Sequence, residues 1–306
     1  MSTSERISKL PPQMLVFIAV LMWSTGGLLI KLTSLDAFQL TFFRSFLAAL
    51  TVLVLTRRSG LRLDLYGVVT SIIYATLLFL FVWATKHTTA ANAIFLQYTA
   101  PVYILILGPF VIGERFHARD LATIVFCIFG MAMFFVGKLE LNDYRGNIAA
   151  LASGIFLGLY IMLLRHPRAA GTNSVIAVIY GNFLLAVLTL PSAAGVFGTI
   201  TFRDLVLVTV LGVFQIGLSY ILFIKGVTSG TRPLDASIIG FFEPILNPVW
   251  VFLFYGEQPS AWAIAGGLVI VATVAGHTLV QYRVRGRSSA EAFPATEPPA
   301  APGGLD

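Results

Sequence analysis

The sequence predicts an all-α integral membrane protein with ten transmembrane helices arranged as two inverted five-helix repeats. Composition predicts the membrane: 57% of the residues are hydrophobic, 11% are charged, and the mean hydropathy is +0.87. A typical soluble domain is about 45–50% apolar and about 25% charged. This chain therefore carries too few charges to cover a surface that faces water. Two further observations, a succession of long apolar runs and an internal repeat, predict the helices and the two halves.

Apolar runs of the length that a helix needs to cross a bilayer, about 20 residues, recur along the chain. The predicted spans of the first half are 13–34, 37–56, 65–86, 91–112 and 119–137. Those of the second half are 146–164, 173–191, 204–226, 235–255 and 261–281. The first run is too long for the core of a signal peptide, so we expect it to remain as a span.

A repeated pattern relates the two halves. Proline, eleven further residues and Gly-Glu occur in PVYILILGPFVIGE (101–114) and again, 143 residues later, in PILNPVWVFLFYGE (244–257). Each copy belongs to a unit of five helices, and because five is odd, the second unit enters the membrane from the opposite side. We expect a first repeat at 13–137, an outer linker at 138–145 and a second repeat at 146–282. Inverted repeats are typical of secondary transporters, whose substrate sites lie near the membrane midplane.

Basic residues between the helices predict the orientation. Fourteen Lys and Arg residues lie on one set of connections and helix ends, and five lie on the other. Because connections rich in Lys and Arg stay in the cytoplasm, we expect the N-terminal segment 1–12 and the tail 283–306 to be cytoplasmic. The tail is rich in Pro, Ala, Gly and Ser and is predicted to be disordered. The expected location is a bacterial-type cytoplasmic (inner) membrane.

Several classes of function are disfavoured. Cys127 is the single cysteine, so no intrachain disulfide can form and no metal cluster is indicated. The basic residues form no arginine-rich stripe with interleaved aromatic residues, which argues against nucleic-acid binding. The hydrolase patterns G-x-S-x-G and H-E-x-x-H and a Gly-rich phosphate loop do not occur. We expect no enzymatic activity, no cofactor and no metal.

Two motifs carry a resemblance to a known family. WSTGG (23–27) followed by Lys31, and the pattern EP…GE that starts at Glu243, are similar to those of the EamA-type drug/metabolite transporter superfamily. The resemblance covers roughly residues 13–282 and is closest to the aromatic amino-acid exporter branch. It implies a carrier that exports small metabolites without ATP. The two repeats differ in one respect, because Ala100 precedes Pro101 where Glu243 precedes Pro244.

Two charged residues are predicted to lie deep within spans, where a charge costs about 2.5–3.5 kcal/mol on insertion scales. Glu243 has three interpretations: a structural partner of Arg44 or of a backbone donor, a proton-coupling carboxylate, or a ligand for a substrate amino group. Arg44 has two: an anchor to a carboxylate or to carbonyls at a helix end, or a ligand for a substrate carboxylate, which its planar fork would suit.

Polar residues within several spans predict a substrate cavity, because such groups usually face the interior of a bundle. The predicted substrate-binding residues are Trp23, Arg44, Tyr74, Gln97, Tyr160, Asn182, Gln215, Glu243 and Asn247. Each polar one is also explained singly as a hydrogen-bonding contact between helices. Together they outline a mostly apolar pocket with a few polar anchors, which is the usual form of a small-molecule site.

Repeated prolines predict gating elements. Pro101 leaves the carbonyl of Gln97 without its helical donor, and Pro244 does the same to Gly240. Carbonyls freed at membrane depth persist only where protein or a water-filled cavity satisfies them. We expect Pro101, Pro244 and Pro248 to kink the fourth and ninth helices as gates around the cavity, and a static kink caused by packing is the alternative.

These observations predict a secondary transporter that exports small metabolites by alternating access, with aromatic or other hydrophobic amino acids as substrates. One deep acid and one deep base would suit a zwitterion. The alternatives are a multidrug carrier and a sugar-phosphate or nucleotide-sugar carrier. A phosphate substrate would favour several deep basic residues, and only Arg44 qualifies. A membrane receptor or membrane enzyme is the alternative from another class.

The expected partners are a small-molecule substrate and the lipid bilayer, with the protein acting as a monomer. The segments GIFLG (154–158) and GVTSG (226–230) match the small-xxx-small pattern, which favours close helix packing inside the bundle and leaves a dimer contact open.

Overall fold

The structure is a computed structural model that describes residues 10–56, 61–134, 136, 143–255 and 260–292. Every regular element in these residues is a helix, as the sequence predicts. The first half contains α2 (Pro12–Trp23), α3 (Gly26–Leu32), α4 (Ala37–Thr56), α5 (Leu65–His87), α6 (Ala90–Gln97), α7 (Ala100–Val111) and α8 (Ala118–Phe134). The second half contains α9 (Tyr144–Leu163), the short η2 (Pro167–Ala169), α10 (Ile176–Ala194), α11 (Phe202–Thr209), the π-helix η3 (Val210–Leu218), α12 (Ser219–Thr228), α13 (Pro233–Gly240), α14 (Phe242–Tyr255) and α15 (Ala261–Ala292).

Eight helical segments of the described residues are long and apolar enough to cross a membrane. They cover residues 12–32, 37–56, 65–87, 92–111, 144–163, 176–194, 202–228 and 261–281. A multi-pass membrane protein is thereby confirmed. The other two predicted spans, 119–137 and 235–255, fall on α8 and on α13 with α14, which are helical but are not among these eight. The count of ten spans therefore stays a prediction, and the predicted boundary at 282 falls inside α15.

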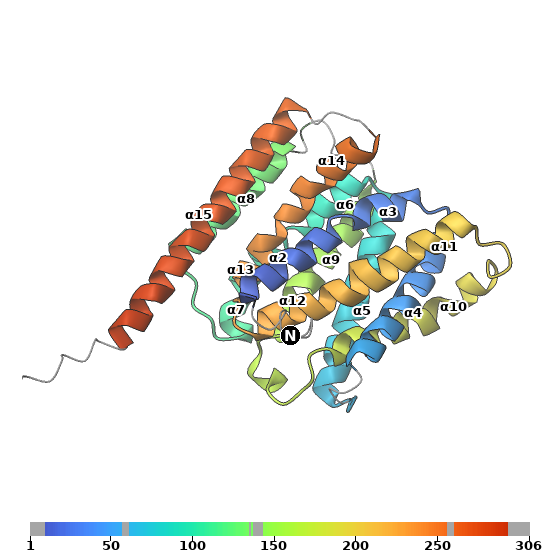
Figure 1. Cartoon of the computed structure of the whole chain (residues 1–306), viewed down its shortest axis with the longest axis horizontal. Helices are drawn as coiled ribbons and strands as arrows, with labels where there is room; N and C mark the ends of the chain where they lie inside the picture. Colours follow the sequence, from blue (N-terminus) through green and yellow to red (C-terminus); the bar gives the residue numbers. More distant parts are fainter. Residues whose placement is uncertain (1–9, 57–60, 135, 137–142, 256–259, 293–306) are drawn as a thin grey trace, which may run out of the picture.

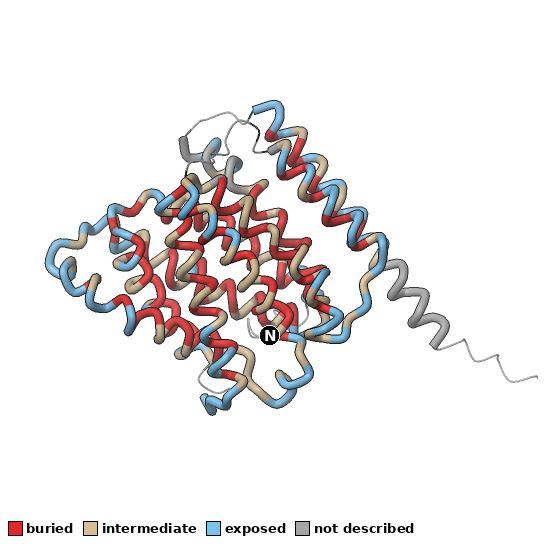
Figure 2. The backbone as a smooth tube through the Cα atoms, turned by 180° about the vertical axis from the view of Figure 1, so that it is seen from behind, coloured by how far each residue is buried: buried red, intermediate tan, exposed pale blue. Residues whose placement is uncertain are grey.

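The helices form one bundle with a pair at its edge (Figure 1). In both views α8 and α15 lie side by side along that edge, while buried residues concentrate in the rest of the bundle (Figure 2). The connections α7–α8, α9–α10 and α12–α13 lie at the same end of the bundle. We call this the basic end, because Arg115, Arg119, Arg165, Arg168 and Arg232 lie on these connections or beside them. The opposite end carries the α3–α4, α5–α6 and α10–α11 connections.

Two helices are interrupted at equivalent places in the two halves. The break between α6 and α7 falls at Tyr98 and Thr99, and the break between α13 and α14 falls at Phe241, 143 residues after Tyr98. Each break lies two or three residues before a proline of the repeat, in the turn where Pro101 or Pro244 leaves a carbonyl without its helical donor. Movement at these breaks stays a prediction. Unchanged transport rates in both Pro101→Ala and Pro244→Ala would contradict it.

Glycines of α9 make room for the first break. A Cβ built on Gly154 would lie 2.8 Å from the carbonyl oxygen of Gln97, and one on Gly158 would lie 3.2 Å from that of Ala100. The GIFLG segment therefore packs directly against the backbone of the interrupted helix. This contact supports the interpretation of the segment as a packing motif inside the bundle.

The predicted first span is also interrupted, which the sequence analysis did not foresee. Ser24 and Thr25 separate α2 from α3, and their hydroxyls donate to the carbonyls of Leu21 and Met22. Such local bonds compete with helical ones, and Gly26 and Gly27 follow at once. The WSTGG motif is therefore a helix break in the middle of the membrane segment, and it lies beside the cavity described next.

Candidate functional site

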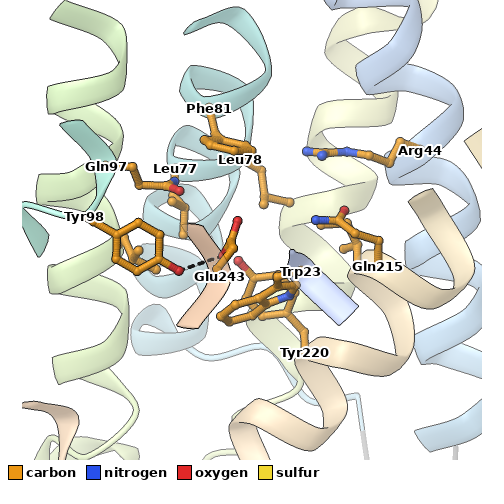
Figure 3. Close-up of a pocket in the computed structure, with 12 residues that line it drawn as sticks. Trp23, Arg44, Leu77, Leu78, Phe81, Gln97, Tyr98, Gln215, Tyr220 and Glu243 are labelled. Atoms are coloured by element: carbon orange, nitrogen blue, oxygen red, sulfur yellow. Dashed lines mark hydrogen bonds between the residues drawn. The ribbon is translucent and has the colours of Figure 1, made fainter. Parts of the chain in front are cut away.

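A cavity lies at the centre of the bundle, and both halves of the chain line it (Figure 3). The empty space measures about 430 Å³ with its opening to solvent, and the centre of a water molecule can move within about 40 Å³ of it. Its lining consists of Trp23, Arg44, Leu77, Leu78, Phe81, Gln97, Tyr98, Leu157, Gln215, Ile216, Tyr220 and Glu243.

Arg44 is a buried cation without a partner. Its side chain is 1% exposed, and Nε, Nη1 and Nη2 make no hydrogen bond within the part of the chain that the structure describes. An unpaired charge in a low-dielectric interior is costly unless a ligand compensates it. Among the described residues no carboxylate or helix-end carbonyl accepts a hydrogen bond from Arg44, so nothing there supports its interpretation as an anchor. Figure 3 shows its guanidinium pointing into the cavity.

Gln215 accompanies Arg44 on the same side of the cavity (Figure 3). It lies on η3, the π-helical part of the long α11–α12 segment, and such rare turns occur frequently at functional sites. Its side-chain oxygen is buried and has no partner among the described residues. A Cβ on Gly26 would lie 2.5 Å from its Nε2, so the glycine of the WSTGG break leaves the space that Gln215 occupies.

Glu243 lies on the other side of the cavity and pairs with a residue that the sequence analysis missed. The hydroxyl of Tyr98 donates to Oε2 of Glu243 over 2.7 Å, and both side chains are buried. No hydrogen bond joins Glu243 to Arg44, whose guanidinium has no partner among the described residues, so Tyr98 takes the place of the suggested partner. Because Tyr98 follows α6 and Glu243 lies in the first turn of α14, this bond joins the broken helices of the two repeats.

Aromatic rings form one wall of the cavity. Trp23 donates its indole N–H to Ser219 over 2.7 Å, and its ring centroid lies 4.8 Å from that of Tyr220. Trp23 therefore lines the cavity, as the sequence suggested. Tyr220 also lines the cavity. It was not predicted, because nothing in the sequence of its span indicates which of its residues face the cavity.

Tyr74, Tyr160 and Asn182 do not reach the cavity, although they were predicted as substrate-binding residues. The ring of Tyr74 lies behind Tyr220, with centroids 4.9 Å apart, and it packs on Tyr160 at 5.1 Å. Asn182 donates to the hydroxyl of Tyr74 over 3.1 Å. These three residues support the wall from behind.

The other predicted residues divide in the same way. Gln97 lines the cavity and donates to the hydroxyl of Ser153 over 2.7 Å, so it also ties α6 to α9. The side chains of Asn247 and Pro248 lie outside the described residues. Leucine, isoleucine and phenylalanine residues that complete the wall, such as Leu78 and Phe81, carried no signal in a uniformly apolar sequence.

The cavity thus offers two opposite kinds of polar anchor between apolar walls. One side presents an unpaired guanidinium and an amide, which suit a carboxylate. The other presents a carboxylate held by a tyrosine, which suits a positively charged amino group. Within the described residues no group of three or more His, Cys, Asp or Glu side chains could hold a metal ion.

Comparison with known families and proteins gives consistent results. The sequence profile of the EamA-like transporter family matches residues 10–136 and, separately, residues 144–279. The two matches fall on the two predicted halves of the chain. A solved crystal structure with 19% sequence identity superposes with a TM-score of 0.76 over 88% of this chain and 97% of its own, which shows a shared fold.

Three curated relatives are similar over most of their length. The pseudopaline exporter CntI of Pseudomonas aeruginosa is 24% identical, over 84% of this chain and 92% of its own. The uncharacterized transporter YxxF of Bacillus subtilis is 23% identical, over 90% and 91%. An uncharacterized transporter of Archaeoglobus fulgidus is 25% identical, over 85% and 95%.

Proposed function

Because this chain belongs to the EamA-like transporter family and is a transporter rather than an enzyme, we propose that it exports small zwitterionic metabolites, with aromatic or other hydrophobic amino acids as substrates. The observation that carries this proposal is the unpaired guanidinium of Arg44 in an otherwise largely apolar cavity. A substrate carboxylate would supply its missing partner, and the substrate's apolar side chain would face Trp23, Tyr220 and Phe81.

Two further points support export of such a molecule. One relative of similar length is named as an exporter. The cavity also lies between the two interrupted helices, which the bond between Tyr98 and Glu243 joins. In alternating access, separation of these helices at one end and then at the other would expose the site to each side of the membrane in turn.

The orientation is part of the proposal. We place the basic end and both termini in the cytoplasm, because connections rich in Lys and Arg remain there. A cysteine introduced at the exposed Arg168 should be protected from a membrane-impermeant reagent in intact cells. Cys127 is buried and should not interfere. Labelling of residue 168 from outside would overturn this orientation.

Transport by the purified protein tests the substrate class. We expect proteoliposomes to take up labelled phenylalanine and tryptophan, and to take up a hydrophilic amino acid such as serine much more slowly. Each uptake is measured with and without a pH gradient, and empty liposomes provide the control. Absence of amino-acid uptake under both conditions would exclude the proposed substrates, and uptake independent of the gradient would indicate facilitated diffusion.

Glu243 is proposed to bind the substrate's amino group, and Glu243→Gln tests this role. We expect the variant to take up phenylalanine poorly at every pH. We expect 3-phenylpropionate, which lacks the amino group, to compete for the site as well as it does in the unaltered protein. Tyr98→Phe is the matched control, because it removes the donor to Glu243 and leaves the carboxylate in place. A flattened pH dependence in Glu243→Gln would instead identify Glu243 as a proton carrier.

A further inference from the structure

A second polar cluster lies at the basic end, away from the central cavity. It joins the start of α13 to the α8–α15 pair at the edge of the bundle. Nη2 of Arg232 lies 3.2 Å from Oδ2 of Asp120 on α8. Oδ1 of Asp235 on α13 lies 3.0 Å from Nε2 of His277 on α15. Asp235 and His277 are 6% and 8% exposed, so their contact is largely shielded from water.

Carboxylates predominate among the ion-paired groups of this cluster. Nε of Arg232 lies 3.0 Å from Oε1 of Glu114, and Nη1 lies 3.8 Å from Oδ1 of Asp235, in addition to its contact with Asp120. Burial alone lowers the pKa of Arg232, but attraction to Asp235, Glu114 and Asp120 raises it above its ordinary value. One guanidinium thus pairs with three carboxylates, and a second cation, Arg119 on α8, has a buried Nε without a hydrogen-bond partner among the described residues. The exposed ring of His117, 3.7 Å from Asp120, is a further titratable group at this place.

Two carboxylate oxygens of the cluster lack a hydrogen-bond donor. Oε2 of Glu114 and Oδ1 of Asp120 are buried and have no hydrogen-bond partner among the described residues. Such an arrangement attracts positive charge, because Coulomb interactions are strong where water is excluded. Protonation of His277 would supply one such charge.

The hydrogen bonds around His277 provide for two states of its ring, one with an additional proton and one without it. The hydroxyl of Thr123 donates over 2.8 Å to the carbonyl of Arg119, and it lies 3.1 Å from Nδ1 of His277. A hydroxyl has one proton to donate. In the first state that proton lies on the Arg119 carbonyl, the hydroxyl accepts from Nδ1, and Nδ1 therefore carries a hydrogen.

The other ring nitrogen then also needs a proton. In a neutral imidazole with hydrogen on Nδ1, Nε2 is an acceptor, and it would face the carboxylate oxygen of Asp235, a second acceptor, at 3.0 Å. A proton between Nε2 and Oδ1 turns this contact into a charge-assisted hydrogen bond. In this first state the Asp235–His277 pair holds one additional proton, as in an ionised aspartate beside a histidine protonated on both ring nitrogens.

The same atoms define a deprotonated state. If Nδ1 loses its hydrogen, it becomes an acceptor, and Thr123 can turn its hydroxyl from the Arg119 carbonyl toward it. Nε2 would then keep its hydrogen and its bond to Asp235. The proton would leave from Nδ1, and the threonine hydroxyl would compensate by rotation.

From this geometry we propose that His277, held between Asp235 and Thr123, is a proton-binding site through which transport responds to pH. The site lies at the polar junction between α13 and the α8–α15 pair. Loss of its proton would leave the excess negative charge of Glu114, Asp120 and Asp235 less compensated and would weaken this junction. The proposal concerns residues outside the substrate cavity and does not depend on which substrate is carried.

Nitrogen NMR of the full chain, labelled with ¹⁵N-histidine and reconstituted in nanodiscs, tests the site directly. The signal that disappears in His277→Gln identifies residue 277. We expect it to report a ring protonated on both nitrogens at pH 6, and to lose that form in Asp235→Asn and in Thr123→Val. A neutral His277 ring at pH 6, or a protonated ring unaffected by Asp235→Asn, would overturn the proposal.

Transport provides the second measurement. In proteoliposomes, His277→Gln should flatten the pH dependence of uptake, whereas His166→Gln, which alters a partly exposed ring at the same end, should leave it unchanged. Unaltered pH dependence in His277→Gln would contradict the coupling. If that variant fails to fold, Thr123→Val tests the same dependence. Because the NMR signal needs no substrate, failure of the proton site and failure of the proposed substrates are distinguishable.

Discussion

Replacing Arg44 by Gln is expected to reduce phenylalanine uptake at least 30-fold while leaving the thermal stability of the ligand-free protein unchanged or higher. The two effects have one cause. Loss of a buried charge-paired hydrogen bond costs about 2–5 kcal/mol, and about 2 kcal/mol corresponds to a factor of roughly 30. Without substrate, however, the guanidinium is buried and unpaired, so its removal relieves an unfavourable charge.

The measurement combines uptake in proteoliposomes with thermal unfolding in detergent. Phenethylamine, which lacks the carboxylate, should compete for the site about as well in Arg44→Gln as in the unaltered protein. Arg203→Gln, at an exposed position, is the matched control for loss of a positive charge. A lower melting temperature together with an equal loss of binding for both compounds would show that Arg44 is structural.

Replacing Gly154 by Ala is expected to destabilise the protein by about 1–3 kcal/mol, the usual cost of overpacking a tight interior. The added Cβ would lie 2.8 Å from the carbonyl oxygen of Gln97, 3.0 Å from the hydroxyl of Thr99 and 3.1 Å from the carbonyl oxygen of Leu96. Two of these atoms belong to the backbone at the end of α6, so α9 must move away from the break. The readout is the midpoint of thermal unfolding in detergent.

Gly276→Ala provides a control with the same change of atoms. Gly276 lies in α15, and no atom lies within 4 Å of the position its Cβ would take. Since Ala favours helix over Gly by up to about 1 kcal/mol, this variant should be as stable as the unaltered protein or more so. Equal melting temperatures for the two variants would disprove the tight contact between α9 and the break.

Composition and the length of the apolar runs were sufficient to predict the helical membrane fold. They also selected Arg44, Glu243, Gln97, Gln215 and Trp23, all of which line the cavity. Burial of a charge or an amide inside an apolar helix is expensive, so a single sequence already shows such residues as exceptions.

Contacts between distant residues were not predictable in the same way. Tyr98 and Tyr220 are amphipathic residues that suit lipid interfaces, cores and binding sites alike, so their types gave no signal. Tyr98 also falls in a helix break, where the spacing of 3.6 residues per turn no longer indicates which residues share a face. Tyr74 and Asn182 were placed in the cavity because they are polar residues within spans, but their depth in a span does not show whether they face the cavity or lie behind Tyr220.

Gln215 lies in the π-helix at Val210–Leu218, so the direction of its side chain depends on how this segment is wound. Each of its turns holds more residues than an α-helical turn, so conversion to α-helix would displace the register of the residues on one side of it. One residue of displacement in an α-helix corresponds to a rotation of about 100°. Such a rotation would turn Gln215 away from Arg44 without breaking the chain's continuity across the membrane. The side of the cavity that carries Arg44 and Gln215 therefore depends on the register of a π-helical segment.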